Sequence, residues 1–203
     1  QEKYAISCIP GAIILLDLLT KERHVYKTGG GSPAHFEIDP NENMVYVSSH
    51  NFFNRLDSIS MFGPAVIDKF EYRNNRLVWR DSFQWEDGFR YASHRVFYHR
   101  GKPLICTFGQ PNRLIFIDAH TMQLYYYDDI GRDELTDQVD VNLYVNARES
   151  GHSFVALEVS ENGEYIFFLD EQFLYLYHVA DRCIHQKIAY SPAGQTDWDA
   201  YVL

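Results

Sequence analysis

The segment AIILLDLLTKERHVYK, residues 12–27, joins two runs of strand-forming residues through a polar turn. The first run ends at Asp17, and Thr20 follows three positions later. The segments LIFIDAHTMQLYYY (114–127) and LYLYHVADRCIHQK (174–187) align with it without gaps in their first half. Two such runs separated by a short polar segment are typical of a β-hairpin. The alignment therefore predicts that one hairpin occurs at least three times along the chain.

A second kind of hairpin lies between the copies of the first. The segments HFEIDPNENMVYVSS, HRVFYHRGKPLICTF and FVALEVSENGEYIFFLD begin at His35, His94 and Phe154, and each reads as strand, turn and strand. A weaker copy of the first hairpin, VIDKFEYRNNRLVWR, begins at Val66 and has an Asn-Asn turn. Together the two hairpins make a unit of four strands that recurs at roughly fifty residues.

A four-stranded unit with this period is typical of β-propeller blades. We therefore predict an all-β propeller built of four-stranded antiparallel blades, about four of them in this chain. The blade units cover approximately residues 1–30, 31–90, 91–150 and 151–190, and residues 191–203 are a candidate closing strand. A β-sandwich is the alternative all-β architecture, but it does not require a fixed four-strand repeat.

The repeat leaves the total number of blades open. The first blade unit begins at what would be its second strand, and the end of the chain supplies a candidate for the missing first one. The chain is then either a closed ring of four blades or, slightly favoured, half of a larger propeller. A half-propeller exposes long sheet edges, which proteins normally cover. We therefore expect a second chain, identical or different, to complete the ring.

The x-D-x-x-T pattern of the first hairpin, with Asp17 and Thr20 in one copy and Asp118 and Thr121 in another, resembles other propellers. Proteins with YVTN-type repeats, the streptogramin lyases and the propeller lactonases have hairpins of this kind. The resemblance implies the propeller fold. Streptogramin lyases place a catalytic histidine and a metal near the propeller axis, so the resemblance also implies chemistry there.

Composition narrows the classes of partner. Hydrophobic residues make up 46% of the chain, and the 15 Tyr and 14 Phe favour strands. A net charge of −10 and the lack of a Lys/Arg run argue against nucleic acid or an anionic membrane surface as partner. No apolar run approaches the roughly 18 residues of a membrane span. Three cysteines without C-x-x-C spacing and the absence of N-x-S/T sites indicate a cytoplasmic location.

Four histidines recur at one end of the predicted inner hairpins. His35 opens and His50 closes the hairpin of one blade, His94 opens that of the next blade, and His152 precedes the one after. Antiparallel strands return to the end where they began, so the four imidazoles are expected to converge at one mouth of the channel. Imidazole is a good ligand for Fe, Zn and Mn. The pattern predicts a divalent transition metal, and it does not distinguish among these three.

Three charged residues near these histidines are candidate catalytic residues. Glu37 and Asp39 share parity with His35 along one strand, and Arg95 follows His94. A carboxylate offers a general base, and a guanidinium offers a bidentate contact to a substrate carboxylate.

These residues predict a metal-dependent enzyme for a small or medium organic substrate. Lyase, isomerase, hydrolase and oxidoreductase chemistry all remain open. The alternatives are a non-catalytic interaction scaffold or subunit of a larger propeller assembly, and a small-ligand-binding module.

Two further features are predicted to be structural. The histidines of the outer hairpins are expected to have surface or packing roles; they are His24, His120, His178 and His185. The sequence TGGGSP, residues 28–33, is interpreted as a crossover between blades. It does not lead into a helix, as a phosphate-binding loop would.

Overall fold

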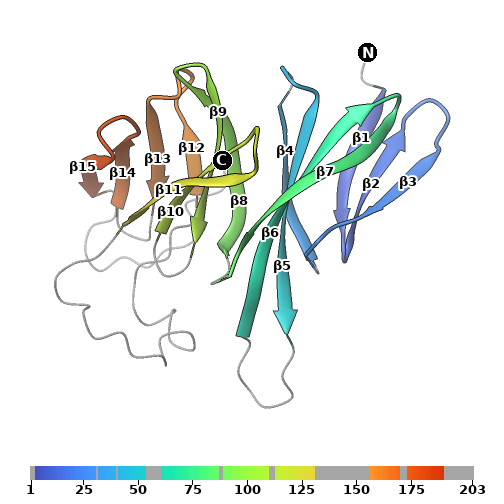
Figure 1. The fold of residues 1–203 in the computed structure, drawn as a ribbon, viewed down its shortest axis with the longest axis horizontal. Coiled ribbons are helices and arrows are strands. Elements are labelled where there is room, and N and C mark those ends of the chain that lie inside the picture. Colours follow the sequence, from blue (N-terminus) through green and yellow to red (C-terminus); the bar gives the residue numbers. More distant parts are fainter. Residues whose placement is uncertain are drawn as a thin grey trace. The chain divides into compact units, whose positions relative to one another are not determined.

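The described part of the chain is built of β-strands alone. A computed structural model describes residues 3–30, 32–39, 41–53, 61–86, 89–109, 113–130, 156–169 and 173–189. Their strands form one three-stranded and three four-stranded antiparallel sheets, each made of strands consecutive in the chain (Figure 1). This confirms the predicted all-β fold of repeated antiparallel units. Among these residues no helix is long and apolar enough to cross a bilayer.

The strands fall into four groups along the chain. The first sheet contains β1 (Tyr4–Ile9), β2 (Ala12–Asp17) and β3 (Arg23–Lys27). The second contains β4 (Ser32–Asp39), β5 (Met44–Phe53), β6 (Met61–Arg73) and β7 (Arg76–Trp85). The third contains β8 (Phe89–His99), β9 (Lys102–Gly109), β10 (Arg113–Asp118) and β11 (Gln123–Asp129). The fourth contains β12 (Ala156–Val159), β13 (Tyr165–Leu169), β14 (Phe173–His178) and β15 (Cys183–Ala189).

The four sheets belong to two compact units. The first unit, Gln1–Gln138, contains the first three sheets, and the second unit, Val139–Leu203, contains the fourth. In the second unit the sheet buries one set of side chains, among them Leu157, Ile166, Phe168, Tyr175 and Tyr177. The rings of Phe168 and Tyr175 stack there with centroids 4.9 Å apart.

One turn recurs in three outer hairpins. In the β2–β3 turn the amide of Lys21 donates to the carbonyl of Asp17 at 2.9 Å, and in the β10–β11 turn Met122 donates to Asp118 at 2.8 Å. The β14–β15 turn has the same bond, from the amide of Arg182, at 2.9 Å. The donor residue has a positive φ in each turn, at 63°, 52° and 55°. The hairpins that the sequence aligned therefore share one backbone conformation.

Aspartate side chains support two of these turns. Oδ1 of Asp17 accepts the amides of Leu19 and Thr20 at 2.8 and 2.9 Å. Oδ1 of Asp118 accepts the amides two and three positions later at 2.9 and 3.0 Å. Asp is favoured in turns for this local bond. The fourth outer hairpin, β6–β7, turns instead at Asn74–Asn75, where both φ angles are positive, as a two-residue hairpin requires.

The middle sheet of the first unit is buried on both faces. Successive residues of a strand point to opposite faces, so β5 sends Val45 and Val47 to one side and Tyr46 to the other. The core shared with the first sheet contains Ile13, Leu15, Val45, Val47, Phe70 and Leu77. The core shared with the third sheet contains Tyr46, Ala65, Ile67, Phe83, Ile105, Ile115 and Ile117. The three sheets of this unit therefore pack face to face.

A buried lysine joins the second and third sheets. Lys69 on β6 is 5% exposed, and its Nζ donates to the carbonyl of Ala119 at 2.7 Å and to that of His120 at 3.2 Å. The hydroxyl of Tyr46 donates to the same Ala119 carbonyl at 3.2 Å. A buried ammonium needs such acceptors because its loss of hydration is costly. The contact fixes the β10–β11 turn of one sheet against the next.

We expect Lys69→Met to lower the free energy of unfolding by about 1–3 kcal/mol, because the His120 carbonyl loses its Lys69 donor and the Ala119 carbonyl keeps only Tyr46. Urea denaturation of the variant and the wild type measures this. Arg80→Met is the control, since Arg80 pairs with Glu71 at the surface and its loss should change stability by less than about 0.5 kcal/mol. Equal effects of the two substitutions would contradict the bridging role of Lys69.

The glycine-rich crossover lies between β3 and β4, as predicted, and packs closely against the second sheet. A Cβ on Gly30 would collide with the side chain of Ser49, so this position needs glycine. The amide of Gly29 donates to Oδ2 of Asp68 at 2.7 Å, and Nε1 of Trp79 donates to Oδ1 at 3.1 Å. Asp68 is 1% exposed, and its burial raises the pKa of the carboxyl group.

The raised pKa of Asp68 predicts a pH-dependent stability. The folded state binds the proton more tightly than the unfolded state, whose carboxyl has a pKa of about 3.9. Stability should therefore fall as pH rises from about 3.9 through the raised pKa of the folded state. Asp68→Asn should remove this part of the slope in urea denaturation measured across pH. Asp81→Asn is the control: Asp81 is exposed, so this substitution should leave the slope of stability against pH unchanged. Identical slopes for the wild type and Asp68→Asn would contradict the prediction.

Candidate functional site

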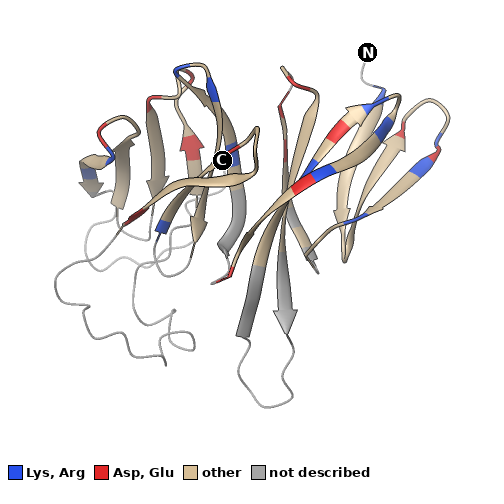
Figure 2. Cartoon of the chain, viewed as in Figure 1, with Lys and Arg blue, Asp and Glu red and all other residues tan. Residues whose placement is uncertain are grey.

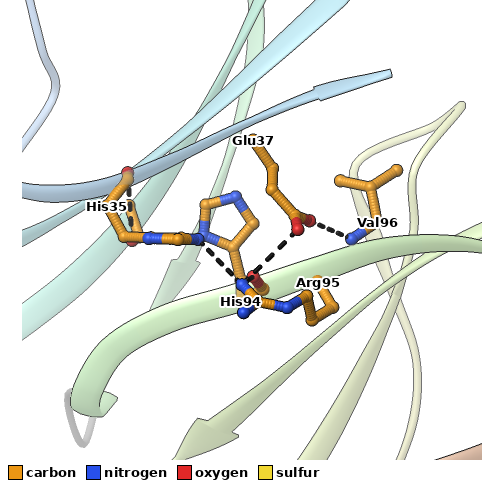
Figure 3. Close-up of polar contacts among 6 residues, drawn as sticks. His35, Glu37, His94, Arg95 and Val96 are labelled. Atoms are coloured by element: carbon orange, nitrogen blue, oxygen red, sulfur yellow. Dashed lines mark hydrogen bonds and ion pairs between the residues drawn. The ribbon is translucent and has the colours of Figure 1, made fainter. Parts of the chain in front are cut away.

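The structure brings His35 and His94 together. His35 lies on β4 and His94 on β8, the first strands of two neighbouring sheets. Their ring centroids are 5.0 Å apart and the rings are nearly perpendicular, at 82° (Figure 3). His94 is completely buried. Two imidazoles from separate sheets of the first unit therefore meet.

Arg95 occupies the space beside this pair. Its Nη1 donates to Nε2 of His35 at 3.2 Å and to the backbone carbonyl of His94 at 3.1 Å (Figure 3). The same nitrogen is 3.4 Å from Oε1 of Glu37. A guanidinium only donates, so Nε2 of His35 is an acceptor in this arrangement. The side chains of His35 and Glu37 thus converge on the Arg95 guanidinium.

The two candidate carboxylates make contacts from β4 to β8. The carboxylate of Glu37 accepts the backbone amide of Val96 (Figure 3). Two residues further along each strand, Oδ2 of Asp39 accepts the hydroxyl of Tyr98 at 2.6 Å. Burial is the larger cause, and the hydrogen bond to Asp39 the second, of a pKa of Tyr98 raised to about 12. The hydroxyl therefore remains a donor at neutral pH. Asp39 is itself 2% exposed.

These contacts lie where the first strands of two sheets, β4 and β8, are in contact. β4 and β8 are edge strands of separate sheets and do not pair with each other through their backbones. The unpaired amide of an edge strand needs another acceptor. Glu37 supplies it for Val96, so this residue has a structural contact whether or not it also takes part in catalysis.

The two remaining histidines of the predicted set are only partly described. His50 pairs with Ser32 in the β4–β5 register, so its backbone lies at the end of β4 where His35 is found. The side chain of His50 lies outside the described part of the structure. His152 lies outside the described residues. Ser48 pairs with His35, is buried, and its hydroxyl donates to the His35 carbonyl at 3.4 Å.

The metal-ligand geometry at β4 and β8 is incomplete within the described residues. Among them, the side chains that bring three ligand atoms within 4.8 Å of one another are His178, Asp181 and His185 at the β14–β15 turn. The sequence interpretation gave these histidines surface or packing roles. The signal that it passed over was His178 standing where the aligned turns have Asp17 and Asp118.

Charged residues of both signs are spread over the described strands. Lys and Arg are interspersed with Asp and Glu along the described strands (Figure 2). The chain matches no model of a protein family and no curated protein sequence.

We expect Glu37→Ala to lower the free energy of unfolding by about 1–3 kcal/mol, because Val96 loses the acceptor of its amide. Glu37→Gln should cost less, since its amide oxygen can still accept that bond. Urea denaturation gives the stabilities, and hydrogen exchange of the Val96 amide reports the bond directly. Unchanged protection of Val96 in Glu37→Ala would contradict the edge contact.

Proposed function

We propose that the sheets are blades of a β-propeller and that the protein is a metal-dependent enzyme acting where His35 of β4 meets His94 of β8. Its substrate would be a small or medium organic molecule. The observation that carries the proposal is the meeting of His35 and His94, whose ring centroids are 5.0 Å apart on neighbouring first strands. Face-to-face packing of three consecutive sheets in the first unit supports the propeller.

The histidines are the proposed metal ligands. His35 and His94 would supply two imidazoles, and His50 and His152 are the further candidates. A divalent transition metal so bound polarises a carbonyl group or activates a water molecule. Glu37 and Asp39 are the nearby carboxylates, and both already accept hydrogen bonds from β8.

The guanidinium of Arg95 sets a condition on this proposal. The lone pair on Nε2 of His35 accepts its hydrogen bond from Arg95, so that nitrogen cannot bind a metal at the same time. A nearby positive charge also disfavours a cation. Metal binding through Nε2 therefore requires Arg95 to leave His35, and Glu37 remains available to pair with it.

The metal content of purified variants tests the proposal. We expect His35→Ala and His94→Ala each to remove most of the bound metal from this site, measured per chain by elemental analysis and native mass spectrometry. His99→Ala is the control, because His99 is the last residue of β8, five positions beyond His94. Arg95→Gln should raise the metal affinity roughly tenfold, since it removes a competing hydrogen bond and a positive charge. Metal content unaffected by His35→Ala and His94→Ala would rule out this metal site.

The contact between Arg95 and the histidines favours a second candidate, a metal-free small-ligand-binding module. An arginine that exchanges Glu37 for a ligand carboxylate forms a strong charge-assisted contact. This function predicts that Arg95→Gln abolishes binding of an organic acid, where the metal proposal predicts tighter metal binding. Native mass spectrometry reports the bound metal, the bound small molecule and any second chain in one measurement.

A further inference from the structure

Three side chains with metal-binding groups meet at the β14–β15 turn of the second unit. Oδ2 of Asp181 is 2.7 Å from Nδ1 of His178 and 3.0 Å from Nε2 of His185. The three ligand atoms all lie within 4.8 Å of one another. The side chain of His178 is 17% exposed, while those of Asp181 and His185 are 57% and 37% exposed. One carboxylate oxygen thus lies between two imidazole nitrogens at an accessible surface.

The turn itself does not need this set of side chains. The bond from the amide of Arg182 to the carbonyl of His178 matches that of the other two outer turns, and so does the positive φ of Arg182. In those turns Asp17 and Asp118 cap the backbone amides. In the β14–β15 turn, His178 occupies the position of these aspartates. The carboxylate belongs to Asp181, three residues later, at the position of Thr20 and Thr121. The backbone keeps its shape, and the side chains form a different cluster.

An aromatic ring supports both histidines. Tyr165 pairs with His178 in the β13–β14 register, and their ring centroids are 4.9 Å apart. The ring of His185 lies 6.2 Å from the same tyrosine and 4.6 Å from the ring of His178. Rings held by such packing lose less rotational freedom when they bind a ligand. The two imidazoles are therefore partly arranged before any ion binds.

We propose that His178, Asp181 and His185 form a surface site for a transition-metal ion of the zinc type. The ligand atoms are Nδ1 of His178, Nε2 of His185 and Oδ2 of Asp181. Two imidazoles and one carboxylate suit Zn²⁺ and its neighbours, whereas Ca²⁺ and Mg²⁺ prefer oxygen ligands alone. Contact with His178, and then with His185, lowers the pKa of the Asp181 carboxyl group.

The step from the hydrogen-bonded cluster to a metal site is small. In the metal-free cluster Nε2 of His185 is hydrogen-bonded to Oδ2 of Asp181, so it carries the hydrogen when it donates to the ionised carboxylate. Nδ1 of His178 lies 2.7 Å from the same oxygen. A metal bound at Nε2 of His185 takes the lone pair of that nitrogen, so the ring then carries its hydrogen on Nδ1. Zn–N and Zn–O distances of about 2.0–2.2 Å require ligand atoms roughly 3.3 Å apart, which small rotations of exposed side chains provide. Three protein ligands leave at least one position open to water or another molecule.

This site does not depend on the proposed function, because its residues belong to a different sheet and compact unit from His35 and His94. Calorimetric titration of the full chain with Zn²⁺ measures the Zn²⁺ affinity of this site. The visible spectrum of the Co²⁺-bound chain reports which ligands bind the metal. We expect His178→Ala, His185→Ala and Asp181→Ala each to weaken Zn²⁺ binding by about tenfold or more, since loss of a mere supporting contact already costs about 10–100-fold.

His24→Ala is the matched control. His24 occupies the position of His185 in the β2–β3 hairpin and lies 3.5 Å from Glu22. Among the described residues it does not belong to a group of three such ligands. Circular dichroism of each variant verifies that the fold is kept, and Asp181→Asn tests the charge with minimal change of shape. The proposal is overturned if the wild type binds no Zn²⁺. It is also overturned if His178→Ala, Asp181→Ala and His185→Ala bind Zn²⁺ as tightly as the His24→Ala control does. Loss of Zn²⁺ binding in His35→Ala and His94→Ala alone would overturn it as well.

Discussion

The packing of the second sheet against the third depends on how the first strands of the two sheets, β4 and β8, contact each other. These strands belong to separate sheets, so no backbone ladder joins them. The Glu37 carboxylate accepts the Val96 amide, and the Asp39 carboxylate accepts the Tyr98 hydroxyl two residues further along each strand. Because both strands have a period of two, contacts at every second residue align. The apolar core between the second and third sheets therefore packs beside a Val96 amide that has an acceptor.

The same constraint decides what the histidine pair can bind. His35 and His94 meet because β4 and β8 are adjacent, and Arg95 is drawn to the same point by acceptors on both strands. In this arrangement the guanidinium competes directly with a metal for Nε2 of His35. The chemistry of the site therefore turns on Arg95. A ligand that binds Nε2 of His35 must displace the hydrogen bond from Arg95, whose Nη1 also lies 3.4 Å from Oε1 of Glu37.

The sequence predicted the repeated parts well and the contacts between them poorly. The hairpins and their turns follow from local patterns, such as the Asp17 and Asp118 caps and the Asn74–Asn75 turn. The contact of Glu37 with Val96 joins residues 59 positions apart. It depends on how two sheets are placed, which no local spacing encodes. The proximity of His35 and His94 was expected from matching positions in two repeats, but the intervening Arg95 was expected to face a substrate.

The outer turns show why a repeat can acquire chemistry without changing its fold. A backbone bond and one residue of positive φ hold each turn, so the side chains at the aspartate and threonine positions can change. In the β14–β15 hairpin these positions carry His178 and Asp181, and His185 comes from the following strand. A set of metal ligands therefore arises at a surface turn through two exchanges of residue type. Substitution is more restricted at His35 and His94, because Arg95 contacts the ring of His35 and the carbonyl of His94 where the two sheets meet.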